Sequence, residues 1–156
     1  NSKAVTTALS EIVWAVNPSH DTLESLSNYL KNYAAHYLDG TGVQGIFDFP
    51  TQVPNRAIEP ELKRNIFLVL KEALNNAVKY AGTDTIWVSF NTDGRDFKLS
   101  IVDKGKGFNP AETTQNNGNG NGLLNMKSRM EQVGCTLDIQ SAVGDGCRIE
   151  ASGKLM

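Results

Sequence analysis

Three polar side chains recur at helical spacing in a segment that is otherwise rich in apolar residues. Glu72, Asn76 and Lys79 lie three or four positions apart within residues 61–80, so they share one side of a predicted helix. The step from Glu72 to Asn76 places two oxygen donors side by side, which suits a hard Mg²⁺ ion that keeps several waters. A solvated helix face would explain Lys79, and an ordinary core position would explain Tyr80, but neither explains Glu72 and Asn76 between apolar neighbours well. The pair therefore indicates a ligand site.

A second polar feature follows a strand-like run at residues 97–102. Asp103 ends this run, and Gly105 and Gly107 come directly after it. An ionised carboxylate only accepts hydrogen bonds, so Asp103 can receive the exocyclic amine of adenine, whereas guanine presents a carbonyl oxygen at that position. The two glycines let the backbone turn tightly and approach a flat base. Taken alone the run could be a surface turn, but beside the helical pair it favours an adenine nucleotide.

Glycine recurs before the next predicted helix, at Gly118, Gly120 and Gly122. Backbone N–H groups at a helix start can face phosphates. No Gly-Lys-Ser or Gly-Lys-Thr follows, so this is not a P-loop. The polar stretch 110–122 predicts a mobile loop that acts as a lid over a triphosphate, with a passive flexible loop as the alternative.

The elements that must position these residues can be read from hydrophobic periodicity. Helices are predicted at residues 4–16, 21–38, 61–80 and 123–133, and strands at 43–49, 85–91, 97–102, 136–141 and 147–152. Asp93-Gly94 predicts a hairpin that makes the strands on either side antiparallel. The chain is therefore expected to be α+β, with one mixed sheet covered by helices.

Composition limits the classes of function. The chain has 156 residues, 40% hydrophobic and 21% charged, which suits one compact domain. A net charge of −2 and a pI near 5.7 give no basic footprint for nucleic acid. No apolar run is long enough for a membrane span, and Cys135 and Cys147 do not form a metal-binding pair or a disulfide framework. We expect a soluble, cytoplasmic piece of protein, although the membrane status of its parent stays open.

In this order and at these spacings, the motifs resemble the catalytic ATP-binding domain of sensor histidine kinases, within the gyrase, chaperone, kinase and mismatch-repair ATPase superfamily. Residues 72–80 are similar to the N box of that family, 103–108 to its first glycine box and 118–123 to its second. Residues 144–147 are similar to its last box, and 11–18 resemble the junction in kinases of the nitrate-sensor type (the HisKA_3 subgroup). The resemblance implies a two-layer α/β sandwich, the Bergerat ATP-binding fold, with a polar ATP lid.

The resemblance also implies roles for single residues. It gives Mg²⁺ to Asn76, with Glu72 as a ligand through water, and makes Glu72 and Asn76 the catalytic pair. Glu72 either activates water or helps transfer, Lys79 binds a phosphate oxygen, and Tyr80 lies against the base or ribose. The residues implied to bind ATP are Asn76, Lys79, Tyr80, Asp103, Gly105, Gly107, Phe108, Gly118, Gly120, Gly122, Leu123 and Cys147. Cys147 departs from the usual threonine, and a thiol is a weak hydrogen-bond donor.

The function implied is transfer of the γ-phosphoryl group of ATP to a histidine, for relay to the receiver domain of a response regulator. His20 follows Pro18 at a helix entry and His36 lies inside the next predicted helix, so neither has the context of an acceptor. We therefore expect the acceptor upstream, with residues 1–18 as the tail of a dimerisation and phosphoacceptor helix, residues 19–156 as the catalytic domain, and a homodimeric parent. The alternatives are an ATPase switch of the gyrase or chaperone kind, an anti-sigma serine kinase, and a degenerate module that only binds partners.

Overall fold

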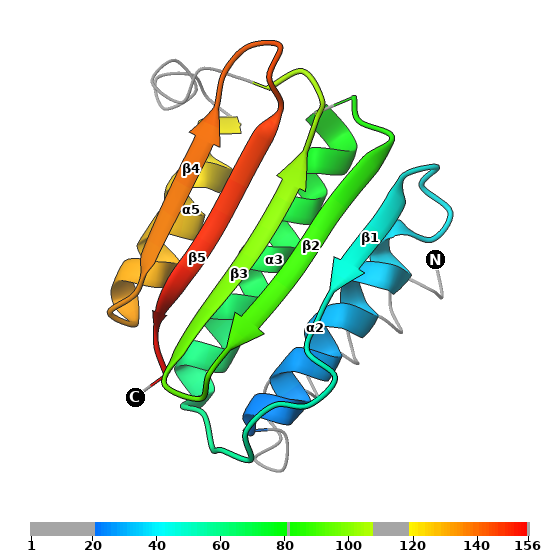
Figure 1. Ribbon diagram of the computed structural model, residues 1–156. Helices are drawn as coiled ribbons and strands as arrows, with labels where there is room; N and C mark the ends of the chain where they lie inside the picture. The colour runs from blue at the N-terminus through cyan, green and yellow to red at the C-terminus, as the bar shows by residue number, and fades with distance from the viewer. Residues whose placement is uncertain (1–20, 81, 108–118, 156) are drawn as a thin grey trace, which may run out of the picture.

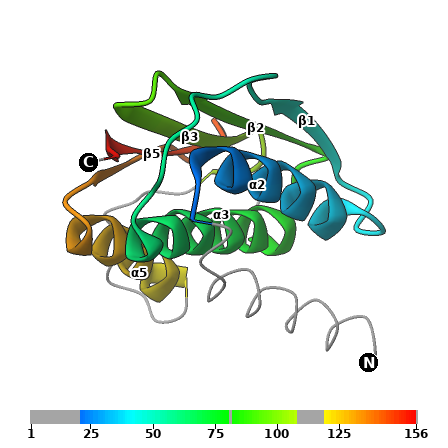
Figure 2. The ribbon, with the colours of Figure 1, turned by 90° about the horizontal axis from the view of Figure 1, so that it is seen from below.

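The computed structural model describes residues 21–80, 82–107 and 119–155. Within these residues a five-stranded sheet and three helices form two layers, with the helices on one face of the sheet (Figures 1 and 2). The helices are α2 (Leu23–Leu38), α3 (Pro60–Tyr80) and α5 (Asn119–Gln132). The strands are β1 (Gln44–Asp48), β2 (Thr85–Thr92), β3 (Asp96–Asp103), β4 (Thr136–Ser141) and β5 (Cys147–Lys154). The predicted α+β sandwich is therefore confirmed, and the helix predicted at residues 4–16 lies outside the described residues.

The sheet is mixed and mostly antiparallel, as predicted. Its strand order is β1-β2-β3-β5-β4 (Figure 1). Strand β1 runs parallel to β2, while the other three neighbouring pairs are antiparallel. Asp93 and Gly94 form the turn between β2 and β3, where Gly94 has a φ of +92° that favours glycine. Strand β3, which ends at Asp103, therefore lies in the middle of the sheet between β2 and β5.

The helix layer packs against the inner face of the sheet with α3 between α2 and α5 (Figure 2). Thr22 caps α2, because its side chain accepts a hydrogen bond from the amide of Ser25 at 3.1 Å. Pro60 opens α3, at the position where a missing N–H costs least. The inward residues predicted for α2 are buried, except Tyr37, which is half-buried: they are Leu23, Leu26, Leu30, Tyr33 and Ala34. None of the helices in the described segments is long and apolar enough to cross a membrane.

Helix α5 differs from the prediction at its start. It begins at Asn119, four residues before Leu123, so Gly120 and Gly122 belong to its first turn and not to a loop. Asparagine and glycine are weak helix formers, which is why their cluster predicts a loop. The first turn of a helix tolerates them, since its N–H groups have no intrahelical acceptor in any case. Contact between Gly122 and α3, described below, adds the tertiary support that local preference lacks.

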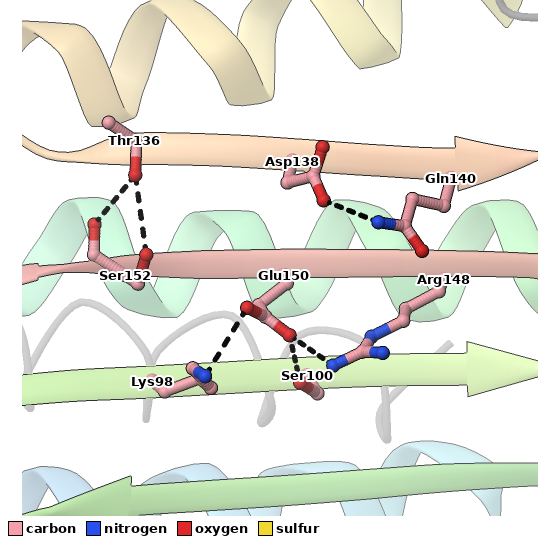
Figure 3. Close-up of polar contacts among 8 residues, drawn as sticks. All are labelled: Lys98, Ser100, Thr136, Asp138, Gln140, Arg148, Glu150 and Ser152. Atoms are coloured by element: carbon pink, nitrogen blue, oxygen red, sulfur yellow. Dashed lines mark hydrogen bonds and ion pairs between the residues drawn. The ribbon is translucent and has the colours of Figure 1, made fainter.

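The outer face of the sheet carries polar side chains that pair with one another (Figure 3). Glu150 accepts a hydrogen bond from Arg148 and one from the hydroxyl of Ser100 at 3.3 Å, and it lies 3.6 Å from Lys98 Nζ. On β4, Asp138 accepts a hydrogen bond from Gln140 at 2.9 Å. An antiparallel sheet with one such solvated face and one covered face is the arrangement that the alternating strands predict.

Candidate functional site

The structure brings the separate polar motifs to one end of the two layers. The carboxyl ends of α3 and β3 lie there together with the first turn of α5 and the start of β5, at the top of the view in Figure 1. Strand β3 runs toward this end of the fold, so its last residue, Asp103, lies there. Helices α3 and α5 run in opposite senses along the sheet, so the end of α3 and the start of α5 meet at this same end.

Glu72 and Asn76 lie one helical turn apart on α3, half-buried, and Gly122 of α5 packs directly against them. A methyl group on Gly122 would overlap Oε1 of Glu72 and would lie 3.4 Å from Nδ2 of Asn76. Only glycine fits at position 122 without displacing the carboxylate of Glu72. The second glycine box and the N box are therefore in contact, although about fifty residues separate them in the sequence.

Asp103 occupies a core position of strand β3. The inward residues of this strand alternate as Phe97, Leu99, Ile101 and Asp103, and Asp103 is only 6% exposed. Its Oδ1 accepts a hydrogen bond from the amide of Gly105 at 2.9 Å. Burial raises the pKa of the Asp103 carboxyl above its ordinary value, and the Gly105 hydrogen bond works against that rise. A carboxylate placed where the pattern calls for an apolar side chain makes Asp103 a candidate functional residue.

Two glycines fix the turn that follows Asp103. Gly107 has a φ of +65°, and a side chain there would overlap the carbonyl oxygens of Ala142 and Gly146. Gly146 has a φ of +77°, and a side chain there would overlap the backbone of Asp103. The first and last glycine boxes thus pack backbone against backbone, and this contact sets the position of the carboxylate.

Cys147 lies directly opposite Asp103 in the β3–β5 register and is half-buried. Burial, together with the neighbouring Asp103 carboxylate, raises the pKa of the Cys147 thiol to about 12, against the effect of a hydrogen bond with Ser141. The thiol is therefore protonated and neutral at physiological pH. It offers a weak donor beside a strong acceptor.

The remaining predicted residues are placed less completely. Lys79 is exposed in the last turn of α3, and Gly105 is half-buried in the turn after β3. Leu123 is buried in the core and so faces away from solvent. The side chain of Tyr80, and Phe108 and Gly118 entirely, lie outside the described residues.

Sequence reasoning missed a hydrogen bond that reaches this site from α2. The hydroxyl of Tyr37 donates to Oδ1 of Asn75 at 3.1 Å, next to Asn76. The hydrophobic periodicity of residues 21–38 predicts that Tyr37 is a core residue, and the sequence pattern assigns no role to Asn75. The available signal was the spacing of Tyr29, Tyr33 and Tyr37, which puts three tyrosines on one helix face.

Comparison with known proteins fits this geometry. Residues 61–155 match the family of histidine kinase-, DNA gyrase B- and HSP90-like ATPases. The chain belongs to this ATPase family. The matched segment begins in the first turn of α3 and contains residues 72–80, 103–108, 118–123 and 144–147, the segments similar to the N box and the glycine boxes.

Individual relatives of this ATPase family add detail. The chain is 30% identical over 145 residues to the sensor histidine kinase YhcY of Bacillus subtilis, a match that covers 88% of this chain and 34% of that protein. The chain thus spans about a third of the length of that relative. These comparisons bear out the resemblance to sensor histidine kinases.

Solved structures of histidine kinases share the fold. The histidine kinase domain of the blue-light activated kinase EL346 of Erythrobacter litoralis superposes with a TM-score of 0.67 at 17% identity, covering 83% of this chain and 61% of that one. The histidine kinase AdeS of Acinetobacter baumannii gives a TM-score of 0.64 at 12% identity, covering 99% of this chain and 80% of that one. At such identities the likeness supports the fold alone.

Proposed function

We propose that this chain is the catalytic ATP-binding domain of a sensor histidine kinase, and that it serves transfer of the γ-phosphoryl group of ATP to a histidine. One observation carries the proposal: Gly122 packs against Glu72 and Asn76 at the end of the fold where Asp103 lies buried. Membership of the ATPase family and the likeness to a sensor histidine kinase support it.

Asp103 supplies recognition of the base. Its carboxylate lies buried at the end of strand β3 and accepts hydrogen bonds, so it suits the exocyclic amine of adenine and not the carbonyl oxygen of guanine. Because Gly105 carries no side chain, a flat ring can approach the backbone of the turn after Asp103, and Gly107 and Gly146 hold that turn in place by backbone contact. The site is therefore expected to select ATP over GTP.

The donor set of α3 fits Mg²⁺ bound together with a triphosphate. In the described ranges, no group of three or more His, Cys, Asp or Glu side chains is placed to hold a metal ion by itself. Mg²⁺ commonly keeps waters and takes only one or two protein oxygens plus substrate phosphates, which is what the amide of Asn76 and the carboxylate of Glu72 can offer. When bound, the ion neutralises charge on the phosphates. Lys79, exposed one turn further along, can pair with a phosphate oxygen.

The chemistry that this domain serves is a simple displacement. A neutral imidazole nitrogen of the acceptor attacks the γ-phosphorus and forms an N–P bond, while the bond from phosphorus to the β,γ-bridging oxygen breaks and ADP leaves. Glu72 can accept a hydrogen bond from the N–H of the attacking imidazole and so orient it. Catalysis of this kind consists mostly of positioning and charge stabilisation. The acceptor histidine then comes from a dimerisation and phosphoacceptor domain of the same parent, which we propose is a homodimer that passes the phosphate to a response regulator.

The proposal is tested by phosphorylation with a separate acceptor. The chain is incubated with γ-labelled ATP, Mg²⁺ and a separately produced phosphoacceptor domain of a sensor kinase that resembles this chain. We expect an acid-labile, base-stable label on the acceptor histidine and none on His20 or His36. An acceptor whose histidine is replaced by glutamine is the matched control, and Asn76→Ala should abolish transfer with native helix content in circular dichroism.

The rival functions give different products. An acid-stable label on a serine of the added protein would identify a serine kinase and overturn the proposal. Release of phosphate without any protein label would instead indicate an ATPase switch. A stoichiometric label on His20 would contradict the expectation that the acceptor lies on another segment.

A further inference from the structure

A ladder of tyrosine rings runs along the face of α2 that meets α3. Tyr29 and Tyr33 have ring centroids 6.2 Å apart, and Tyr33 and Tyr37 have centroids 6.0 Å apart. Phe67 of α3 meets the first two rings edge to face, with centroids at 5.3 and 4.8 Å. Such aromatic contacts stabilise helix packing beyond the area that they bury. The ladder therefore fixes how α2 lies along α3.

Tyr37 ends the ladder at the turn of α3 that carries the candidate site. Its hydroxyl donates to Oδ1 of Asn75 at 3.1 Å, and its ring is half-buried. Burial, and after it the negative charge of Glu72, raises the pKa of the Tyr37 hydroxyl. The hydroxyl is thus a neutral donor at physiological pH, and the carboxylate of Glu72 is close enough to affect it.

Asn75 connects Tyr37 with the residues of the site. It lies three residues after Glu72 and directly before Asn76, in the same helical turn. Successive side chains of a helix leave the axis about 100° apart, so Asn75 can reach α2 while Asn76 faces Gly122 of α5. This turn of α3 is therefore held from two sides, by a tyrosine hydroxyl and by a glycine backbone.

We propose that Tyr37 is a positioning residue for the nucleotide site: through Asn75 it sets the rotation of the α3 turn that presents Glu72 and Asn76 to the metal and the phosphates. The inference rests on the proposed function, because it assumes that these two residues meet Mg·ATP. It goes further in giving α2 a part in the site. The core residues Ala73, Leu74 and Ala77 keep the turn helical without the hydroxyl, so its loss is expected to affect alignment more than folding.

The experiment compares four proteins: the native chain, Tyr37→Phe, Asn75→Ala and the double variant. Dissociation constants are measured by calorimetry for a non-hydrolysable ATP analogue with and without Mg²⁺, and for adenosine. We expect each single variant to weaken binding of the analogue with Mg²⁺ about three- to tenfold, the range that one lost hydrogen bond gives. The double variant should be no weaker than either single one, since both remove the same bond. Affinity for adenosine should not change.

Tyr33→Phe is the matched control, because it removes a hydroxyl from the neighbouring ring of the same ladder. It should leave the magnesium-dependent affinity as in the native chain. Urea unfolding of all five proteins without nucleotide separates a loss of alignment from a loss of fold.

Each other outcome overturns the inference. If the losses of Tyr37→Phe and Asn75→Ala multiply in the double variant, the two residues act independently and the bond between them does not transmit the effect. Equal weakening of adenosine and the analogue would show a general structural defect. If the native chain binds the analogue with Mg²⁺ and the variants bind it equally well, only this inference fails. If the native chain shows no magnesium-dependent binding, the proposed function fails and this inference fails with it.

Discussion

The two halves of helix α3 both direct polar side chains toward neighbouring elements, but the neighbours differ. In the first half, Lys63 is fully buried with Nζ 2.7 Å from Oδ1 of Asp21, and Asn65 is 1% exposed and donates to the carbonyl of Arg129 at 2.8 Å. In the second half, Glu72 and Asn76 are half-buried and face the backbone of Gly122.

The contrast teaches how to distinguish a structural polar group from one that awaits a ligand. Lys63 and Asn65 meet an opposite charge and a carbonyl group supplied by the fold, so their burial is compensated. Glu72 and Asn76 pack against the backbone of Gly122, a residue that offers neither of them a charged or polar side chain as a partner. The same helix therefore anchors the fold at one end and presents chemical groups at the other.

The largest effect is expected from Lys63→Met, which keeps an unbranched side chain of nearly the same length and removes its charge. Breaking a buried ion pair leaves an uncompensated charge and costs about 3–5 kcal/mol. We expect the lower end of that range, because the side chain of Asp21 is 21% exposed and water can reach it. Urea unfolding should show the loss, while the affinity of the folded protein for nucleotide stays native.

Lys98→Met on the outer face of the sheet is the matched control. Lys98 is 53% exposed and lies 3.6 Å from Glu150. An exposed pair contributes less than about 1 kcal/mol, so this variant should unfold nearly as the native chain does. Equal effects at Lys63 and Lys98 would remove the structural role that the comparison gives to the first half of α3.

An intermediate effect is expected from Asp103→Asn. It should change the free energy of nucleotide binding more than the stability of the fold. The amide keeps an oxygen that can accept from Gly105, but it then presents an N–H donor where the carboxylate offers its second oxygen to adenine. ATP binding should weaken by about 1–3 kcal/mol. The preference for ATP over GTP should shrink, which competition calorimetry with both nucleotides can measure. Native selectivity in this variant would show that Asp103 does not read the base.

The same variant should change the dependence of stability on pH. Burial raises the pKa of Asp103 in the folded protein above its ordinary value of 3.8, so the folded state holds this proton more tightly than the unfolded chain. The contribution of Asp103 to stability therefore falls as pH rises from its unfolded to its folded pKa, and the loss is complete above that window. Asp103→Asn has no titrating carboxyl at this position, so this loss of stability with rising pH is absent from the variant. Unfolding midpoints measured across the acid range should show a smaller decline with rising pH than in the native chain.

Most of the fold was predictable because it depends on local patterns. The apolar period of two in Phe97, Leu99 and Ile101 and the hairpin signal at Asp93-Gly94 each determine structure within a few residues. The start of α5 was not predictable in this way. Its first turn is made of weak helix formers, and the contact of Gly122 with α3 involves residues about fifty positions away.

The site was partly predictable for the same reason. Glu72, Asn76 and Asp103 break an apolar pattern, and this break is visible in the sequence. Tyr37 and Lys63 give no such signal. A tyrosine on an inward helix face looks like core, and a lysine near a helix start looks like a solvated charge, so only the tertiary partners Asn75 and Asp21 show what they do.

The smallest effect is expected from Cys147→Thr, which restores the residue that the family more often has. The Cys147 thiol, with its pKa raised to about 12, is protonated and donates weakly beside Asp103. A hydroxyl is a stronger donor of similar size, so it can add one hydrogen bond at the base end of the site, and ATP should bind tighter by less than about 1 kcal/mol. The magnesium dependence of binding should stay native, because Glu72 and Asn76 lie on α3 and not on β5. Calorimetry with and without Mg²⁺ measures both quantities. Weaker binding by Cys147→Thr would mean that this site uses the larger, softer sulfur for packing against the base, and that the hydrogen bond of the usual threonine has no counterpart here.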